Sequence, residues 1–222
     1  MKKVKFCILL VVFCLLVFLF VKSNINAKVS DSELIYLDPG HGGEDSGGTS
    51  KNGTCEKNIN LSICYYLKSF LENSGYSVKM TRYIDSDLAS LNSKNRKTED
   101  ILKRVDLINN SNAIMYISIH CNKYQSEQIK GSQTFYNSKS EENKKLATSI
   151  QDYLKIILQN TNRFPNSIKD KYLTDNVNIT GCLTEVGFLS NPKEEELLRT
   201  EKYQKEVAYA IYLGIINYLS NK

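Results

Sequence analysis

The sequence predicts an α/β sandwich: a single domain with a mostly parallel mixed sheet covered by helices on both faces. Short apolar runs rich in strand-forming residues alternate along the chain with amphipathic segments of helical period, which is typical of such folds. About 190 of the 222 residues remain once an apolar N-terminal stretch is set aside, the length of one domain. A content of 41% hydrophobic and 24% charged residues indicates a folded chain.

The N-terminal stretch is an export signal. Residues 6–21 form an unbroken apolar run, preceded by three lysines and followed by one. Two interpretations stay open, a signal peptide cut after Ala27 or an uncleaved membrane anchor. In both, the lysines stay in the cytoplasm and the domain is extracytoplasmic. We therefore assign 1–32 to a signal peptide or anchor with a short linker, and 33–222 to the folded domain.

The first half of the domain predicts three strands and two helices. The first helix follows from apolar residues at helical spacing, such as Ile59, Ile63 and Leu67, with Gly75 as its stop. A glycine-rich loop precedes this helix, and the polar segment between Ile84 and Asp100 is expected to be irregular. Strands are expected at 34–37, 76–81 and 113–119, and helices at 58–73 and 101–110.

The second half continues the alternation, with no internal repeat or second module. Strands are expected at 131–136 and 181–187, a long amphipathic helix at 141–158, and one or two closing helices over 194–219. In a parallel sheet, the side chains beyond the carboxyl ends of the strands meet at one edge, so functional residues are expected there.

The domain contains only two histidines, and each directly follows a predicted strand. His41 lies in Asp-Pro-Gly-His-Gly-Gly and His120 in Ser-Ile-His-Cys-Asn. Neutral imidazole is the commonest biological metal ligand, and catalytic zinc sites typically combine two histidines with one carboxylate and an open position. The two histidines therefore predict a metal site that needs a third ligand.

Three acids in the glycine-rich loop and at its exit are candidates for this ligand: Glu44, Asp45 and Glu56. Glu56 is the best placed because it opens the first helix and is held by rigid structure. The alternative is that Glu56 only favours the positive N-terminus of that helix. The residues by themselves leave both interpretations open.

Glu185 is a lone carboxylate in a strand that is otherwise small or apolar. A buried carboxylate is costly, so it is normally paired or functional. Beside a metal it can take a proton from water and pass it to a leaving amine. The alternative is a structural hydrogen bond to Arg82 or Arg104.

Taken together, the segments around His41, Glu56, His120 and Glu185 resemble the zinc-dependent N-acetylmuramoyl-L-alanine amidases of the amidase 3 type. The resemblance covers 34–219 and includes a Glu-x-Gly-Phe-Leu-Ser-Asn segment around Glu185. It implies that His41, Glu56 and His120 bind Zn²⁺ and that Glu185 is the catalytic carboxylate. The implied reaction is hydrolysis of the amide between N-acetylmuramic acid and L-alanine of the peptidoglycan stem peptide.

Two further features concern the surroundings of this site. Asn122 is a candidate for orienting substrate, although an asparagine in a loop is more often a turn residue. The family usually has a small residue where Cys121 stands, and Cys55 also adjoins a proposed ligand. We expect both thiols to point away from the metal, and we expect the domain cysteines to form no disulfides.

A small member with an N-terminal apolar segment and no wall-binding repeats resembles the sporulation amidases of endospore formers. That resemblance implies a role in spore cortex synthesis, in the formation of muramic-δ-lactam, with a downstream deacetylase and, in some species, an activating lipoprotein. It also implies the forespore intermembrane space as the location, with membrane contact through residues 6–21 if these are not cleaved.

Other functions fit the sequence less well. The net charge of +5 is mild and scattered, so no nucleic-acid-binding surface is expected. The glycine spacing after Pro39 does not match a nucleotide-binding loop. Two alternatives stay open: another zinc peptidoglycan hydrolase, such as a peptidase, and a non-catalytic cell-wall-binding protein.

Overall fold

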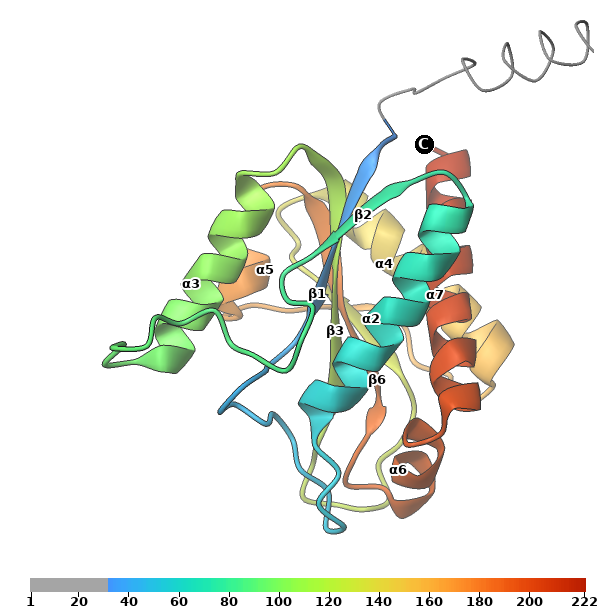
Figure 1. The fold of residues 1–222 in the computed structure, drawn as a ribbon. Coiled ribbons are helices and arrows are strands. Elements are labelled where there is room, and N and C mark those ends of the chain that lie inside the picture. Colours follow the sequence, from blue (N-terminus) through green and yellow to red (C-terminus); the bar gives the residue numbers. More distant parts are fainter. Residues whose placement is uncertain (1–31) are drawn as a thin grey trace, which may run out of the picture. The chain divides into compact units, whose positions relative to one another are not determined.

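A mixed sheet forms the centre of the domain in the computed structural model, which describes residues 32–222 (Figure 1). Its strands are β1 (Leu34–Pro39), β2 (Ser77–Met80), β3 (Ala113–Asn122), β4 (Gln133–Tyr136), β5 (Asn166–Ser167) and β6 (Thr180–Phe188). They lie in the order β2-β1-β3-β6-β4-β5. All neighbours are parallel except β4 and β6, which are antiparallel. The predicted fold class is confirmed.

Helices cover both faces of the sheet (Figure 1). One face carries α2 (Glu56–Asn73), α4 (Glu141–Leu158) and α7 (Glu201–Ser220), and the other carries α3 (Arg96–Asn109) and α5 (Tyr172–Asn176). The short α6 (Pro192–Leu198) leads from β6 to α7. The larger apolar core includes the buried Ile63, Ile117 and Ile211, and a smaller one on the α3 side includes Tyr36 and Leu173.

The structure differs from the sequence prediction in three places. Helix α3 begins at Arg96, inside a segment predicted to be irregular, because the Asn95 side chain accepts a hydrogen bond from the Thr98 amide and caps the helix. Strand β5 and helix α5 were not predicted, since two and five residues are too short to show periodicity. The closing segment forms two helices, which the prediction allowed.

The predicted signal peptide or anchor falls almost wholly on residues 1–31, outside the described part of the chain. Residues Glu33–Lys222 form one compact unit. Within residues 32–222, no helix is both long enough and apolar enough to cross a membrane.

Candidate metal centre and active site

His41, Glu56 and His120 meet at the carboxyl edge of the sheet. Strands β1 and β3 are parallel neighbours, so the residues that follow Pro39 and Ile119, which are paired in register, reach the same point. The two imidazole ring centroids are 4.9 Å apart. One possible ligand atom from each of the three residues lies within 4.8 Å of the other two, which is close enough to share one metal ion.

The Glu56 carboxylate lies between the two imidazoles. Its Oε1 is 2.8 Å from Nδ1 of His120 and 3.3 Å from Nε2 of His41, while its Oε2 accepts a 2.7 Å hydrogen bond from the Gly48 amide. Burial raises the pKa of Glu56, but hydrogen bonds to His120 and His41 outweigh burial and hold it below its usual range. A mere preference for the helix N-terminus does not account for these contacts.

The other two acids considered for the third ligand lie elsewhere. Asp45 Oδ2 is 2.9 Å from Nδ1 of His41, on the opposite side of that ring from Glu56. Such a carboxylate fixes the orientation of a metal-binding imidazole and makes it a stronger ligand. Glu44 is 79% exposed and lies 3.6 Å from Arg96. Of the three candidate acids, Glu56 is therefore the one that lies between the two histidines.

The titration of His41 also fits a metal-binding role. Burial lowers the pKa of His41, but Glu56 and then Asp45 outweigh burial and raise it to about 8. An imidazole must be neutral to bind a metal, so a metal ion at this position would displace a proton from the ring at neutral pH.

Two glycines make room for this cluster. A Cβ atom on Gly40 would lie 2.2 Å from Cε1 of His120, and one on Gly47 would lie 2.6 Å from Oε2 of Glu56. Gly47 also has φ of +65°, in the left-handed region that glycine tolerates. Gly40 and Gly47 are therefore required by close packing against the cluster.

Two buried arginines hold the backbone that carries His41, which has φ of +63°. Arg104 Nη2 donates to the His41 carbonyl at 2.7 Å, and Arg82 Nη2 donates to the Gly40 carbonyl at 3.1 Å. Arg104 also forms ion pairs with Asp38 at 2.8 Å and with Asp100 at 2.9 Å. Non-glycine residues rarely adopt this conformation, so surrounding bonds must impose it.

The Asp38 carboxylate beneath this loop is buried and ionised. Burial raises its pKa, but the Arg104 guanidinium and hydrogen bonds from Ser118 and Thr81 outweigh burial and lower it to about 2. Both oxygens accept short hydrogen bonds, 2.6 Å from Ser118 and 2.7 Å from Thr81. The first Asp of the Asp-Pro-Gly-His motif is thus a structural residue.

Glu185 faces the same point from β6. It is paired in register with His120, and its Oε2 is buried without a hydrogen-bond partner among the described residues. Burial raises its pKa to about 7; the nearby His120 opposes this shift and Glu56 adds to it. The alternative of a bond to Arg82 or Arg104 is wrong, because Arg82 donates to backbone carbonyls and Arg104 to Asp38, Asp100 and neighbouring oxygens.

A cavity of about 350 Å³ opens onto these four residues. Asn122 lines it as the last residue of β3 and not as a turn residue, and its Oδ1 accepts a 2.8 Å hydrogen bond from the Lys123 amide. The lining also includes Ile168, Lys171 and Tyr172, from the short β5–α5 region. Sequence analysis missed these residues because no motif or periodicity marks them.

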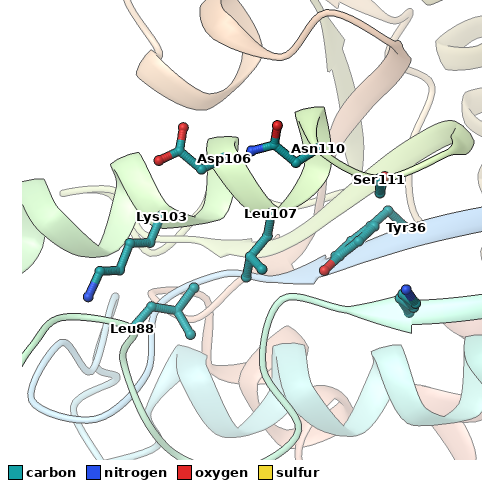
Figure 2. A pocket seen from close by; sticks show the side chains of 8 residues that line it. Tyr36, Leu88, Lys103, Asp106, Leu107, Asn110 and Ser111 are labelled. Carbon is teal, nitrogen blue, oxygen red and sulfur yellow. The ribbon is translucent and has the colours of Figure 1, made fainter.

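A larger cavity of about 480 Å³ lies between α3, β1 and β2 (Figure 2). Tyr36, Lys103 and Leu107 are among its lining residues, and none of the three residues of the histidine cluster is. Size alone therefore favours this second cavity, whereas the convergence of titratable groups favours the cavity beside the histidines as the candidate site.

The cysteines beside the cluster do not face the metal position. The Cys121 thiol is buried and lies 3.5 Å from Oδ1 of Asn60, and the Cys55 thiol lies 3.5 Å from the Gly53 carbonyl. All four cysteines of the described chain are free thiols. The expectations about the thiols and about disulfides are thus confirmed for residues 32–222.

Comparison with known proteins identifies relatives of this arrangement. A family model described as "N-acetylmuramoyl-L-alanine amidase" matches residues 35–217. The chain is 43% identical to the germination-specific N-acetylmuramoyl-L-alanine amidase of Bacillus subtilis, over 100% of this chain and 97% of that protein.

Solved structures agree with the sequence comparison. The CwlD amidase of Clostridioides difficile, solved in complex with the GerS lipoprotein, is 41% identical with a TM-score of 0.84, over 86% of this chain and 100% of that chain. An N-acetylmuramoyl-L-alanine amidase of Clostridium difficile 630 is 30% identical with a TM-score of 0.78, over 87% of this chain and 100% of that one.

Proposed function

The chain belongs to the amidase 3 family of N-acetylmuramoyl-L-alanine amidases, hydrolases of the amide bond between N-acetylmuramic acid and L-alanine, and we propose that a zinc ion at the histidine cluster serves this reaction. His41, Glu56 and His120 are the proposed ligands. Two imidazoles and one carboxylate are a common catalytic zinc set, and their ligand atoms lie within 4.8 Å of one another. A bound zinc ion supplies a Lewis acid that polarises a carbonyl and lowers the pKa of water.

Glu185 is the proposed proton carrier. Its unpartnered Oε2 is buried near the cluster, and a pKa of about 7 lets the carboxylate both accept and release a proton at neutral pH. Oε2 takes the proton of the attacking water and then delivers it to the nitrogen of the departing L-alanine. The orphaned oxygen is the single observation that carries this role, because a structural carboxylate would be paired.

The remaining protein groups bind and orient. The buried Asp38 and Arg104 hold the backbone of His41, and Asp45 holds its ring. Asn122 lines the cavity, and we propose a minor role for it in orienting the substrate.

The biological setting is proposed from the relatives. The substrate is peptidoglycan, and similarity to the germination-specific amidase favours spore cortex, where stem-peptide removal precedes the action of a deacetylase on the way to muramic-δ-lactam. Similarity to the amidase solved with a lipoprotein favours an activating lipoprotein partner for this chain as well. The proposed location is outside the cytoplasm, in the forespore intermembrane space, with residues 6–21 as the export signal or anchor.

Mass spectrometry of products from purified peptidoglycan tests the reaction. We expect stem peptides with a free N-terminal L-alanine, together with glycan strands that keep an intact lactyl group. Cleavage within the stem peptide would instead identify a peptidase. Absence of any product from the zinc-loaded full-length protein would favour a non-catalytic wall-binding protein.

A further inference from the structure

Lys171 stands out among the charged residues of the active-site cavity. It lines both the cavity of about 350 Å³ and an adjoining hollow of about 280 Å³ that also contacts the two histidines. Its ammonium group has no acidic partner within 4.0 Å among the described residues, whereas the cavity lysine Lys97 lies 3.6 Å from Asp45. A lone cation beside a reaction centre is available for a substrate anion.

The backbone of Lys171 is fixed even though its side chain is exposed. Lys171 is the N-cap residue of α5, and its carbonyl accepts hydrogen bonds from the Asp175 amide at 2.9 Å and the Thr174 hydroxyl at 3.0 Å. The buried Leu173 anchors this short helix in the smaller core, and Asp170 before it has φ of +62°. The ammonium group therefore extends from a defined point on the cavity wall.

The acids lining the same cavity are mostly engaged elsewhere. Glu56 bonds to both histidines, and Asp38 pairs with Arg104. Asp170 lines only the adjoining hollow. Glu185 and Lys171 line the same cavity, and the positive charge of Lys171 opposes the rise that burial causes in the pKa of Glu185.

The position of Lys171 near Glu185 determines which part of the substrate Lys171 can contact. In the proposed reaction Glu185 protonates the departing L-alanine nitrogen, so the peptide side of the scissile bond lies beside Glu185, and thus beside Lys171. The residue after L-alanine in a stem peptide is a glutamate linked through its side chain, so its α-carboxylate is left free unless it is amidated. That carboxylate is the first anion beyond the scissile nitrogen.

We propose that Lys171 binds the α-carboxylate of this second stem-peptide residue and thereby makes the enzyme selective for stem peptides that are not amidated at this position. The proposal rests on the proposed function. Lys171 touches the substrate away from the reacting atoms, so it determines specificity and is no part of the proton transfer. A charge-assisted hydrogen bond at an exposed site corresponds to about a 10-fold preference.

The test compares two muropeptide substrates that differ only in a carboxylate or a carboxamide at this α-carbon. The kcat/KM ratio between them is measured for the wild type and for Lys171→Gln, both loaded with zinc. Any effect of Lys171 on Glu185 applies equally to both substrates and cancels in this ratio. Lys169→Gln is the matched control, since it removes a positive charge from an exposed residue of the same segment.

We expect the wild type and Lys169→Gln to prefer the carboxylate substrate by about 10-fold, and Lys171→Gln to show a ratio near 1. Absence of a preference in the wild type would overturn the proposal. So would a preference that survives Lys171→Gln, or one that is lost in Lys123→Gln on the strand side of the cavity instead.

A second measurement separates this proposal from the proposed function. Equilibrium binding is measured without any hydrolysis for the dipeptide L-alanyl-D-glutamate whose γ-carboxyl group is blocked as an amide, and the comparison is the form in which the α-carboxyl group is amidated as well. If the wild type cleaves neither substrate but binds the carboxylate form about 10-fold more tightly through Lys171, the proposed reaction fails and the anion site stands. Equal binding of the two forms would overturn the anion site alone.

Discussion

The two walls of the active-site cavity are built in opposite ways. The ligand wall, which we define as His41, Glu56 and His120, lies at the carboxyl ends of β1 and β3 and at the start of α2, and each of its three side chains has a bonding partner. The peptide wall, which we define as residues 168–174, runs from the end of the two-residue β5 into the five-residue α5, and its Lys171 and Tyr172 side chains are exposed.

The difference between the two walls corresponds to two tasks, metal binding on the ligand wall and substrate recognition on the peptide wall. A metal centre requires ligands held within narrow limits, so its side chains are locked by hydrogen bonds and by close-packed glycines. A surface that selects a peptide needs only a few placed groups on a stable backbone, and it can change without disturbing the core. We therefore expect substitutions on the two walls to affect different quantities, and the following experiments test that contrast.

The largest expected effect is on the rate and comes from Glu185→Gln. This change keeps the size and burial of the side chain but removes the group that accepts the proton. We expect kcat to fall by about 10³- to 10⁴-fold, while zinc content and the free energy of unfolding stay close to those of the wild type. Release of stem peptides from purified peptidoglycan measures the rate, and undiminished release would assign the proton step to another residue.

On stability, Arg104→Met behind the ligand wall has the largest expected effect. It leaves the buried Asp38 and Asp100 carboxylates without their ion-pair partner, which costs about 3–5 kcal/mol. Urea unfolding of the metal-free protein measures the loss. Arg199→Met is the control, with an expected change within about 0.5 kcal/mol, because the Arg199 side chain is 58% exposed and its partner Glu195 keeps hydrogen bonds from Ser50, Asn52 and Thr54. Equal effects of the two changes would show that the buried network adds nothing.

The pH dependence of stability follows from Asp38. The pKa of Asp38 in the folded protein, about 2, is below its ordinary value of 3.8. The contribution of Asp38 to the free energy of unfolding is therefore fully present above pH 3.8 and is lost as the pH falls toward 2. The shift corresponds to about 2 kcal/mol. Unfolding of the metal-free wild type and of Asp38→Asn between pH 5 and pH 2 isolates this contribution. Parallel curves for the two proteins would contradict it.

The smallest expected effect comes from Tyr172→Ala on the peptide wall. Because Tyr172 is 47% exposed, we expect the free energy of unfolding to change by no more than about 0.5 kcal/mol. The neighbouring Leu173→Ala is the control, since Leu173 is 5% exposed and its loss costs about 2–4 kcal/mol. If Tyr172→Ala were as destabilising as Leu173→Ala, the peptide wall would be part of the core and the contrast would not hold.

The same contrast explains what the sequence could predict. The ligand wall was predictable because only two histidines exist and each follows a strand with a strong apolar pattern, so the parallel topology brings them together. Glu56 was predicted less sharply, since a glutamate at a helix start has an ordinary electrostatic reason to be there. Its position at the start of the first helix favoured Glu56 over Glu44 and Asp45, and the family resemblance then favoured the ligand role over the electrostatic interpretation.

The peptide wall could not be predicted. Its strand and helix are too short for a periodic signal, and they are held by tertiary contacts such as the burial of Leu173. Lys171 is one of many lysines in the chain, and what distinguishes it among the described residues is that it lines both hollows beside the histidines without an acidic partner within 4.0 Å. The early start of α3 was missed for a related reason, because one capping bond from Asn95 outweighs a polar composition.

Metal content tests the central claim most directly. The wild type, Glu185→Gln and His120→Ala are each equilibrated with zinc, freed of excess metal and analysed for zinc per chain. We predict close to one zinc ion per chain for the wild type and for Glu185→Gln, and far less for His120→Ala, because two remaining ligands bind zinc weakly. Equal zinc in all three proteins would contradict a centre built from His41, Glu56 and His120.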